Sequence, residues 1–164
     1  SICGATETIL LHEKIIKKFC NPLLKKLEKD GCKIYGDHIL RKYYKGKSYP
    51  VKEKDWSTEY LAPIVSVKSV KDCEGAINHI NKYGTMHTDS IITKNKKTAK
   101  KFLKNVKSSI AMHNTSTQFA DGGEFGFGGE VGISTNRMSP RGPVGLNQLT
   151  SYKYEIISNG QIRK

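Results

Sequence analysis

Arginine is scarce in this 164-residue sequence, although basic residues are abundant. Only four of its 28 basic residues are arginine, and the 15 acidic residues leave a formal net charge of +13. Recognition of phosphates and base edges by bidentate hydrogen bonds favours arginine over lysine. The sequence also carries no known nucleic-acid-binding motif. We therefore attribute the charge mainly to lysine usage and do not expect nucleic acid as a partner.

Long hydrophobic runs and an N-terminal signal pattern are also missing. Hydrophobic residues make up 37% of the chain and charged residues 26%, which is typical of a globular protein. No apolar run approaches the ~20 residues that a membrane-spanning helix needs. We therefore expect a cytoplasmic protein with no membrane partner.

Cysteine and histidine are few and scattered. The four cysteines include no CxxC pair and no zinc-ribbon spacing, and the five histidines include no HExxH motif. We therefore expect neither a disulfide nor a metal site. Neither a GxxxxGK[ST] nor a GxGxxG motif occurs at a strand-to-helix junction, so the sequence offers no motif that binds nucleotide phosphates.

The first third of the chain has a strand followed by an amphipathic helix. Residues 6–11 favour a strand, and residues 13–29 favour a helix that ends near Gly31. The helix has an apolar residue at every fourth position along one face, at Ile15, Phe19, Leu23 and Leu27. Pro22 predicts a kink or a break in this helix. Residues 32–35 favour a short strand.

Strands and helices alternate regularly from residue 64 to residue 113. The predicted order is strand 64–70, a helix capped by Asp72, strand 90–93, helix 96–107 and strand 109–113. The inner face of the first helix is predicted to carry Ala76, Ile77 and Ile80. Short connections between alternating strands and helices favour an α/β fold with a parallel sheet and right-handed crossovers.

The C-terminal third is different in composition. Six of the 15 glycines lie between Gly122 and Gly132, which predicts a loop with several positive φ angles and a backbone that comes close to another group. Residues 149–158 alternate and are rich in β-branched and aromatic residues. This pattern predicts a terminal strand that pairs with another chain or with a sheet edge.

Three blocks of the sequence resemble the γ-glutamyl phosphate reductase family of the aldehyde dehydrogenase superfamily. The longest is NTSTQFADGGEFGFGGEVGIST, which RGPVGL follows. The second is ICGATETILLH, residues 2–12. The third spans residues 70–91, with Ala76-Ile77, His79-Ile80, Tyr83-Gly84 and His87-Thr88-Asp89 at the spacing of the family signature.

The resemblance implies a parallel-sheet catalytic domain of the aldehyde dehydrogenase type over residues 1–148. Residues 149–164 are then a C-terminal oligomerisation strand and tail that form a homo-oligomer. In the family the nucleotide-binding domain lies mainly before the nucleophilic cysteine, and only two residues precede Cys3 here. We therefore expect that domain to be absent from this chain, and a separate nucleotide-binding chain is one way to supply it.

The resemblance also implies a reaction. The family reduces L-γ-glutamyl 5-phosphate, an acyl phosphate, to L-glutamate 5-semialdehyde with NADPH in proline biosynthesis. A thiolate suits this chemistry because it expels phosphate and keeps the acyl group as a thioester. We expect the isolated chain to be inactive alone. The alternative is a non-catalytic remnant that acts only as a folded oligomerising domain.

By resemblance, Cys3 is the nucleophile. Glu59 lies in TEYLAP, which is similar to the superfamily's E-x-F-G-P segment, whose glutamate contacts the nicotinamide ribose; a solvated loop carboxylate is the alternative interpretation. Asn114, Ser116 and Thr117 are implied to bind the substrate.

Some positions depart from the family pattern. Gly4 stands where the family has Asn, and Gln118 stands where it usually has Arg. His87 matches the signature without an assigned role. For Arg141, in the RGP segment, we favour a structural role over an inter-domain contact.

Overall fold

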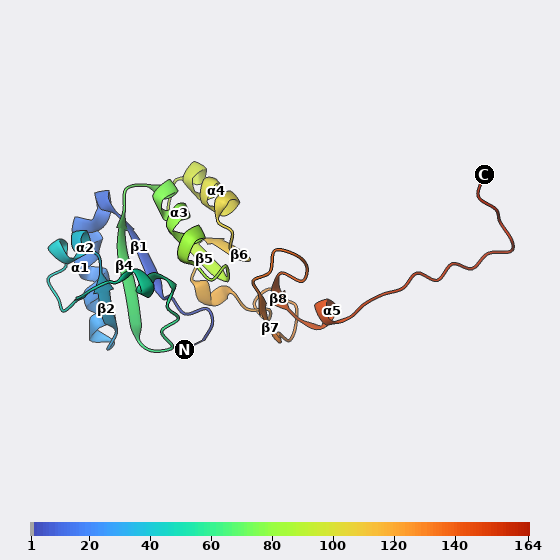
Figure 1. The fold of residues 1–164 in the computed structure, drawn as a ribbon, viewed down its shortest axis with the longest axis horizontal. Coiled ribbons are helices and arrows are strands. Elements are labelled where there is room, and N and C mark those ends of the chain that lie inside the picture. Colours follow the sequence, from blue (N-terminus) through green and yellow to red (C-terminus); the bar gives the residue numbers. More distant parts are fainter. Residues whose placement is uncertain (1) are drawn as a thin grey trace.

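A parallel four-stranded sheet forms the first part of the molecule (Figure 1). The computed structural model describes residues 2–164. The strands are β1 (Thr8–His12), β2 (Lys33–Gly36), β3 (Tyr49–Pro50) and β4 (Ile64–Val70), in the order β1-β4-β2-β3. The register of β1 and β4 pairs Thr8 with Ser66 and His12 with Val70, so the two strands start at the same edge of the sheet. The strands expected at 6–11, 32–35 and 64–70 are confirmed.

Helix α1 (Glu13–Lys29) follows β1 directly and packs on this sheet. Its buried residues are Ile16, Cys20 and Leu24, whereas Ile15, Phe19 and Leu23 are 38–45% exposed. The buried stripe is therefore shifted by one residue from the predicted face. Two apolar rows run along α1, and the row that faces the sheet is made of Ile16, Cys20 and Leu24.

Pro22 lies inside α1, which runs without interruption from Glu13 to Lys29, so the predicted break into two shorter helices is wrong. The helix is held on both sides of Pro22 by Cys20 and Leu24, which are fully buried. The Asn21 side chain adds two hydrogen bonds, one donated to the Tyr43 carbonyl (2.8 Å) and one accepted from the Lys45 amide (2.9 Å). Tertiary contacts therefore outweigh the local cost of an interior proline.

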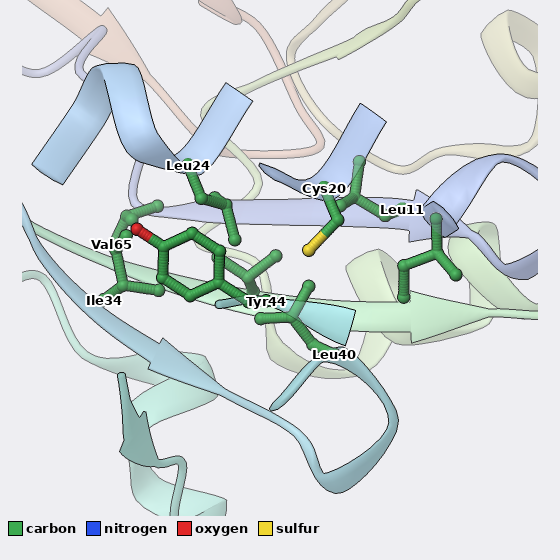
Figure 2. Packing of buried hydrophobic residues seen from close by; sticks show 9 residues of the cluster. Leu11, Cys20, Leu24, Ile34, Leu40, Tyr44 and Val65 are labelled. Carbon is green, nitrogen blue, oxygen red and sulfur yellow. The ribbon is translucent and has the colours of Figure 1, made fainter. Parts of the chain in front are cut away.

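The main core lies between α1, the sheet and the short helix α2 (His38–Tyr43). Figure 2 shows Cys20 and Leu24 of α1 facing Ile34, Val65 and Leu40. These side chains form one continuous apolar cluster, which also includes Leu11, Tyr44 and Val67. Between β3 and β4 the chain forms one turn of 3₁₀ helix, η1 (Glu53–Ser57).

Two helices and two strands follow β4 in the order α3 (Cys73–Tyr83), β5 (Thr88–Ile91), α4 (Lys96–Asn105) and β6 (Ile110–His113). The expected alternation of elements is confirmed, and Asp72 caps α3 through a 2.8 Å hydrogen bond from the Gly75 amide. The predicted parallel pairing is confirmed, but β5 and β6 pair with each other in a sheet separate from β4. Strand β4 already pairs with β1 and β2, so both of its edges are occupied.

Helices α3 and α4 enclose a smaller core with the second sheet, built on Ile77, Phe102 and Val106. On α3 the buried side chains are Ile77 and His79, so only one of the three predicted inner residues is fully buried. His79 packs edge-on against Trp56, with 5.0 Å between the ring centroids.

The C-terminal part contains little regular structure. After η2 (Thr117–Phe119), a small antiparallel pair forms from β7 (Gly132–Ser134) and β8 (Gly142–Val144), and one turn of helix, α5 (Leu146–Leu149), follows. Gly126 and Gly128 have φ angles of 76° and 78°, which confirms the left-handed positions expected in the glycine-rich loop.

The predicted strand at 149–158 is not formed. Residues 150–164 extend away from the rest of the chain without a helix or strand, and all of them are exposed (Figure 1). A strand requires a second edge for its backbone hydrogen bonds, and this segment reaches none within the single chain. No helix in the described part of the chain is long and apolar enough to cross a membrane.

Candidate functional site

Cys3 lies at the tip of a tight turn that leads into β1. The Ala5 amide donates a 3.0 Å hydrogen bond to the Ile2 carbonyl, so Cys3 and Gly4 are the two central residues of the turn. The Cys3 thiol is exposed, whereas Gly4 is buried. An exposed thiol on a fixed backbone is available to a substrate that approaches from solvent.

The other three cysteines lie in different surroundings. Cys20 is buried, while Cys32 and Cys73 are partly buried. Burial raises the pKa of all three thiols. Because the thiolate is the reactive form, a raised pKa makes these three cysteines weaker nucleophiles.

Two carboxylates lie near the starts of β1 and β4. Glu7 directly precedes β1, and its carbonyl accepts a 2.9 Å hydrogen bond from the Ser66 amide. Burial and the nearby charge of Glu59 both raise the pKa of Glu7. Glu59 itself is exposed, in the loop before β4. In that loop, Leu61 has a φ of 49°, a conformation that non-glycine residues rarely adopt.

His87 lies within reach of the charges of Glu59 and Glu130. Its Nδ1 is 2.8 Å from the Thr88 hydroxyl, and its Nε2 is buried with no hydrogen-bond partner among the described residues. Burial lowers the pKa of His87, whereas the charges of Glu130 and Glu59 raise it. The preceding residue, Met86, has a φ of 64°.

The loop after β6 is held by its own side chains. Asn114, with a φ of 56°, donates from Nδ2 to the Thr93 carbonyl (3.0 Å) and accepts at Oδ1 from the Thr93 amide (2.8 Å). The Ser90 hydroxyl donates to the Thr115 carbonyl (2.7 Å). Ser116 Oγ accepts from the Gln118 amide (3.2 Å) and caps η2.

Thr117 joins this loop to the Cys3 turn. Its hydroxyl donates a 2.6 Å hydrogen bond to the carbonyl of Gly4. The structure therefore brings Cys3 and Thr117 into one contact network and places Glu59 near Glu7 and His87. The Asn114 side chain is instead turned to Thr93. Arg141 donates a hydrogen bond to the Lys107 carbonyl, a structural contact of the kind we favoured.

Two acidic residues of the site were not identified from the sequence. Glu7 lies inside the ICGATETILLH block, and Glu130 lies inside the glycine-rich block, where its Oε2 accepts a 2.7 Å hydrogen bond from the Gly122 amide. Both residues lie within sequence blocks that resemble the family, and this position was the only sign in the sequence that they belong to the site. No group of three His, Cys, Asp or Glu side chains in the described residues is arranged to hold a metal.

Comparison with known proteins identifies the family. The aldehyde dehydrogenase family model matches residues 48–154. The chain is 48% identical over 162 residues to the gamma-glutamyl phosphate reductase of Bradyrhizobium diazoefficiens and 51% identical to that of Methylocella silvestris. These matches cover 99% of this chain but only 37% and 38% of the two relatives, so the chain spans less than two-fifths of their length.

A solved structure agrees with these sequence matches. The crystal structure of gamma-glutamyl phosphate reductase from Thermotoga maritima superposes with a TM-score of 0.94 at 44% identity, over 99% of this chain and 39% of that one. The predicted fold class and family are confirmed by this similarity. The chain therefore belongs to the aldehyde dehydrogenase family.

Proposed function

We propose that this chain is the cysteine-bearing catalytic portion of an enzyme that reduces L-γ-glutamyl 5-phosphate to L-glutamate 5-semialdehyde in proline biosynthesis. The observation that carries the proposal is Cys3, which is exposed at the tip of a turn anchored by Thr117. Its support is the 48–51% identity to gamma-glutamyl phosphate reductases over nearly the whole chain.

The first half of this reaction needs only the thiol and the acyl phosphate. The Cys3 thiolate sulfur attacks the γ-acyl carbon, a carbon–sulfur bond forms, and the carbon–oxygen bond to phosphate breaks. Phosphate leaves with the bonding electron pair, and the acyl group remains as a thioester on Cys3. The backbone N–H groups of Cys3 and Gly4 are proposed to stabilise the negative oxygen of the tetrahedral intermediate, because the Ala5 amide already donates to the Ile2 carbonyl.

NADPH is the proposed cofactor, and Glu59 is the residue proposed to hold its nicotinamide ribose. The Glu59 carboxylate is exposed and forms no ion pair within residues 2–164, so it is free to accept hydrogen bonds from two ribose hydroxyls. A bound nicotinamide would supply the hydride that reduces the thioester to the aldehyde. The residues present therefore fit the ribose end of the cofactor.

The loop from Asn114 to Thr117 is proposed to line the substrate site. Ser116 is the best suited of its side chains to bind an anionic group, because its oxygen accepts from the Gln118 amide while its hydroxyl proton remains free to donate. Asn114 retains one amide proton beyond the one donated to Thr93. The excess of basic residues in the chain favours approach of a doubly anionic substrate.

The C-terminal segment is proposed to form a homo-oligomer by pairing as a strand with a second copy. Its apolar side chains are almost fully exposed in the single chain, with values of 81–92% for Tyr152, Tyr154, Ile156 and Ile157. A separate nucleotide-binding chain is a further proposed partner, and the cytoplasm is the proposed location. The alternative function is a folded oligomerising domain without catalysis.

A chimera tests the catalytic proposal. The segment of the Bradyrhizobium diazoefficiens enzyme that precedes the matched region is joined to this chain, and NADPH oxidation is followed with γ-glutamyl phosphate generated in the assay. We expect reductase activity that the Cys3→Ser chimera lacks. We expect no NADPH oxidation from the 164-residue chain alone.

A chimera that folds and binds NADPH but does not reduce the acyl phosphate would favour the non-catalytic alternative. The Cys32→Ser chimera is the matched control, because Cys32 is a partly buried thiol with a raised pKa in the main core. It should retain the activity of the unmodified chimera.

A further inference from the structure

We propose that Thr117 is a positioning residue that fixes the Cys3 turn through Gly4, and that it does not bind the substrate. The inference rests on the proposed function in one respect, the assignment of Cys3 as nucleophile. It is carried by the hydrogen bonds and packing between the Cys3 turn and the loop after β6.

The hydrogen-bond inventory of Thr117 argues against a donor role toward an anion. A hydroxyl has a single proton, and Thr117 donates it to the Gly4 carbonyl at 2.6 Å. The Thr6 hydroxyl lies 3.4 Å from the Thr117 hydroxyl, so Thr6 is the donor in that longer contact. The remaining lone pairs of Thr117 would repel a carboxylate or a phosphate.

The packing of Gly4 provides an independent observation. A Cβ atom built on Gly4 would lie 3.0 Å from the Thr117 carbonyl oxygen and 3.4 Å from the Gln118 Cα. The backbones of the turn and of η2 are therefore in close contact, and a side chain at position 4 requires one of them to move. The absence of a side chain at Gly4 lets the Thr117 hydroxyl reach its carbonyl.

The loop that carries Thr117 is itself well anchored. Asn114 holds Thr93 through two hydrogen bonds, Ser90 holds the Thr115 carbonyl, and the Ala120 amide donates to the Thr117 carbonyl at 3.1 Å. Asn114 keeps a left-handed backbone conformation, which persists only where surrounding contacts maintain it. The 114–120 segment is thus anchored to Ser90 and Thr93 by side-chain hydrogen bonds.

This contact connects two parts of the fold. The Cys3 turn leads into β1 of the four-stranded sheet, whereas Thr117 follows β6 of the second sheet. The Thr117 hydrogen bond and the close backbone packing at Gly4 therefore couple the position of the nucleophile to the loop proposed to line the substrate site. Small errors in such a distance are costly for an attack that requires near-contact geometry.

The test uses the 164-residue chain and compares Thr117→Val, which removes the hydroxyl, with Thr117→Ser, which keeps it. The first readout is hydrogen exchange of the Ala5 amide, which closes the Cys3 turn. We expect exchange to become about fivefold to tenfold faster in Thr117→Val, the range expected for loss of one hydrogen bond, and to stay near wild type in Thr117→Ser. Thr150→Val is the control, because Thr150 is an exposed threonine whose hydroxyl donates to the nearby Asn147 carbonyl.

The second readout separates positioning from substrate binding. Acylation of Cys3 is measured by mass spectrometry at increasing concentrations of γ-glutamyl phosphate, which carries both anionic groups of the proposed substrate and is produced in the mixture by a γ-glutamyl kinase. We expect Thr117→Val to lower the maximal rate about tenfold with an unchanged half-saturating concentration. A raised half-saturating concentration with an unchanged maximal rate would mean that Thr117 binds substrate, and would overturn the proposal.

Gly4→Ala provides a second way to loosen the same contact. We expect it to accelerate exchange of the Ala5 amide as Thr117→Val does, with little further change in the double variant. Unchanged exchange in both single variants would also overturn the proposal. The exchange measurement needs no substrate, so it decides the proposal even if the chain proves not to accept acyl phosphates.

Discussion

Two parts of this molecule carry similar strand-forming sequence patterns and have very different structures. In β4, IVSVKSV lies between β1 and β2, and Val65 and Val67 are at most 3% exposed. In the tail, YKYEII forms no strand, and Ile156 and Ile157 are 91% and 92% exposed. An alternating apolar pattern therefore specifies a strand only where the chain also supplies a neighbouring strand edge for pairing and an apolar surface on which the strand can pack.

The largest expected difference between the two parts is in the free energy of unfolding. Leu24→Ala removes a fully buried side chain from the main core and should cost about 2–5 kcal/mol. Ile156→Ala changes an exposed side chain and should stay within about 0.5 kcal/mol of wild type. Urea denaturation of both variants measures this. Equal effects would mean that the tail is packed in solution.

A second expected difference is the dependence of the free energy of unfolding on pH. It comes from two buried side chains outside the tail, His79 and Asp89. Burial lowers the pKa of His79 to about 4, so its stabilising contribution is complete above pH 6.5 and is lost as the pH falls toward 4. Burial raises the pKa of Asp89 to about 6, although a hydrogen bond from Ser108 opposes this, so its contribution is complete below pH 4 and is lost as the pH rises through 6.

These two contributions have opposite signs, and each amounts to at most about 3 kcal/mol. We therefore expect a shallow pH profile for the wild type between pH 4 and 6.5. Stability should rise toward pH 4 in His79→Gln and fall toward pH 4 in Asp89→Asn. The tail variant Glu155→Gln is the control, since its exposed pair with Lys153 should leave the profile unchanged. Parallel profiles for all three variants would show that these buried groups do not titrate as described.

The smallest expected effect on stability comes from removing the tail. A chain that ends at Leu149 loses only exposed residues, so its free energy of unfolding should match wild type within about 0.5 kcal/mol. Self-association measured by analytical ultracentrifugation should decrease, because the removed segment carries the proposed pairing strand. Unchanged self-association would contradict the proposed role of the tail and would mean that the oligomer contact lies on another surface.

Local elements of the packed part were predictable from the sequence, while their arrangement was less so. The bounds of α1 and β4 and the Asp72 cap follow from periodicity and capping chemistry. The buried row of α1 and the separation of β5 from β4 depend on contacts between distant segments. Periodicity within one segment carries no information about which edges of a neighbouring strand are already paired.

The candidate site shows a similar division. The matching blocks pointed to Cys3 and to the loop from Asn114 to Thr117. The fold was needed to show that the Thr117 hydroxyl points toward the Gly4 carbonyl. It was also needed to show that the charge of Glu59 acts on both Glu7 and His87. The family resemblance implied that Thr117 binds the substrate, whereas its single hydroxyl proton is donated to the Gly4 carbonyl.

The most direct test of Cys3 as the nucleophile is to trap the acyl group on this chain. The 164-residue chain is incubated with γ-glutamyl phosphate produced in the mixture by a γ-glutamyl kinase, quenched in acid, and analysed by peptide mass spectrometry. We expect a glutamyl thioester on Cys3 that hydroxylamine removes and that Cys3→Ser lacks. A thioester of equal yield on Cys32 or Cys73, or no adduct on a chain shown to be folded, would contradict this assignment of the nucleophile.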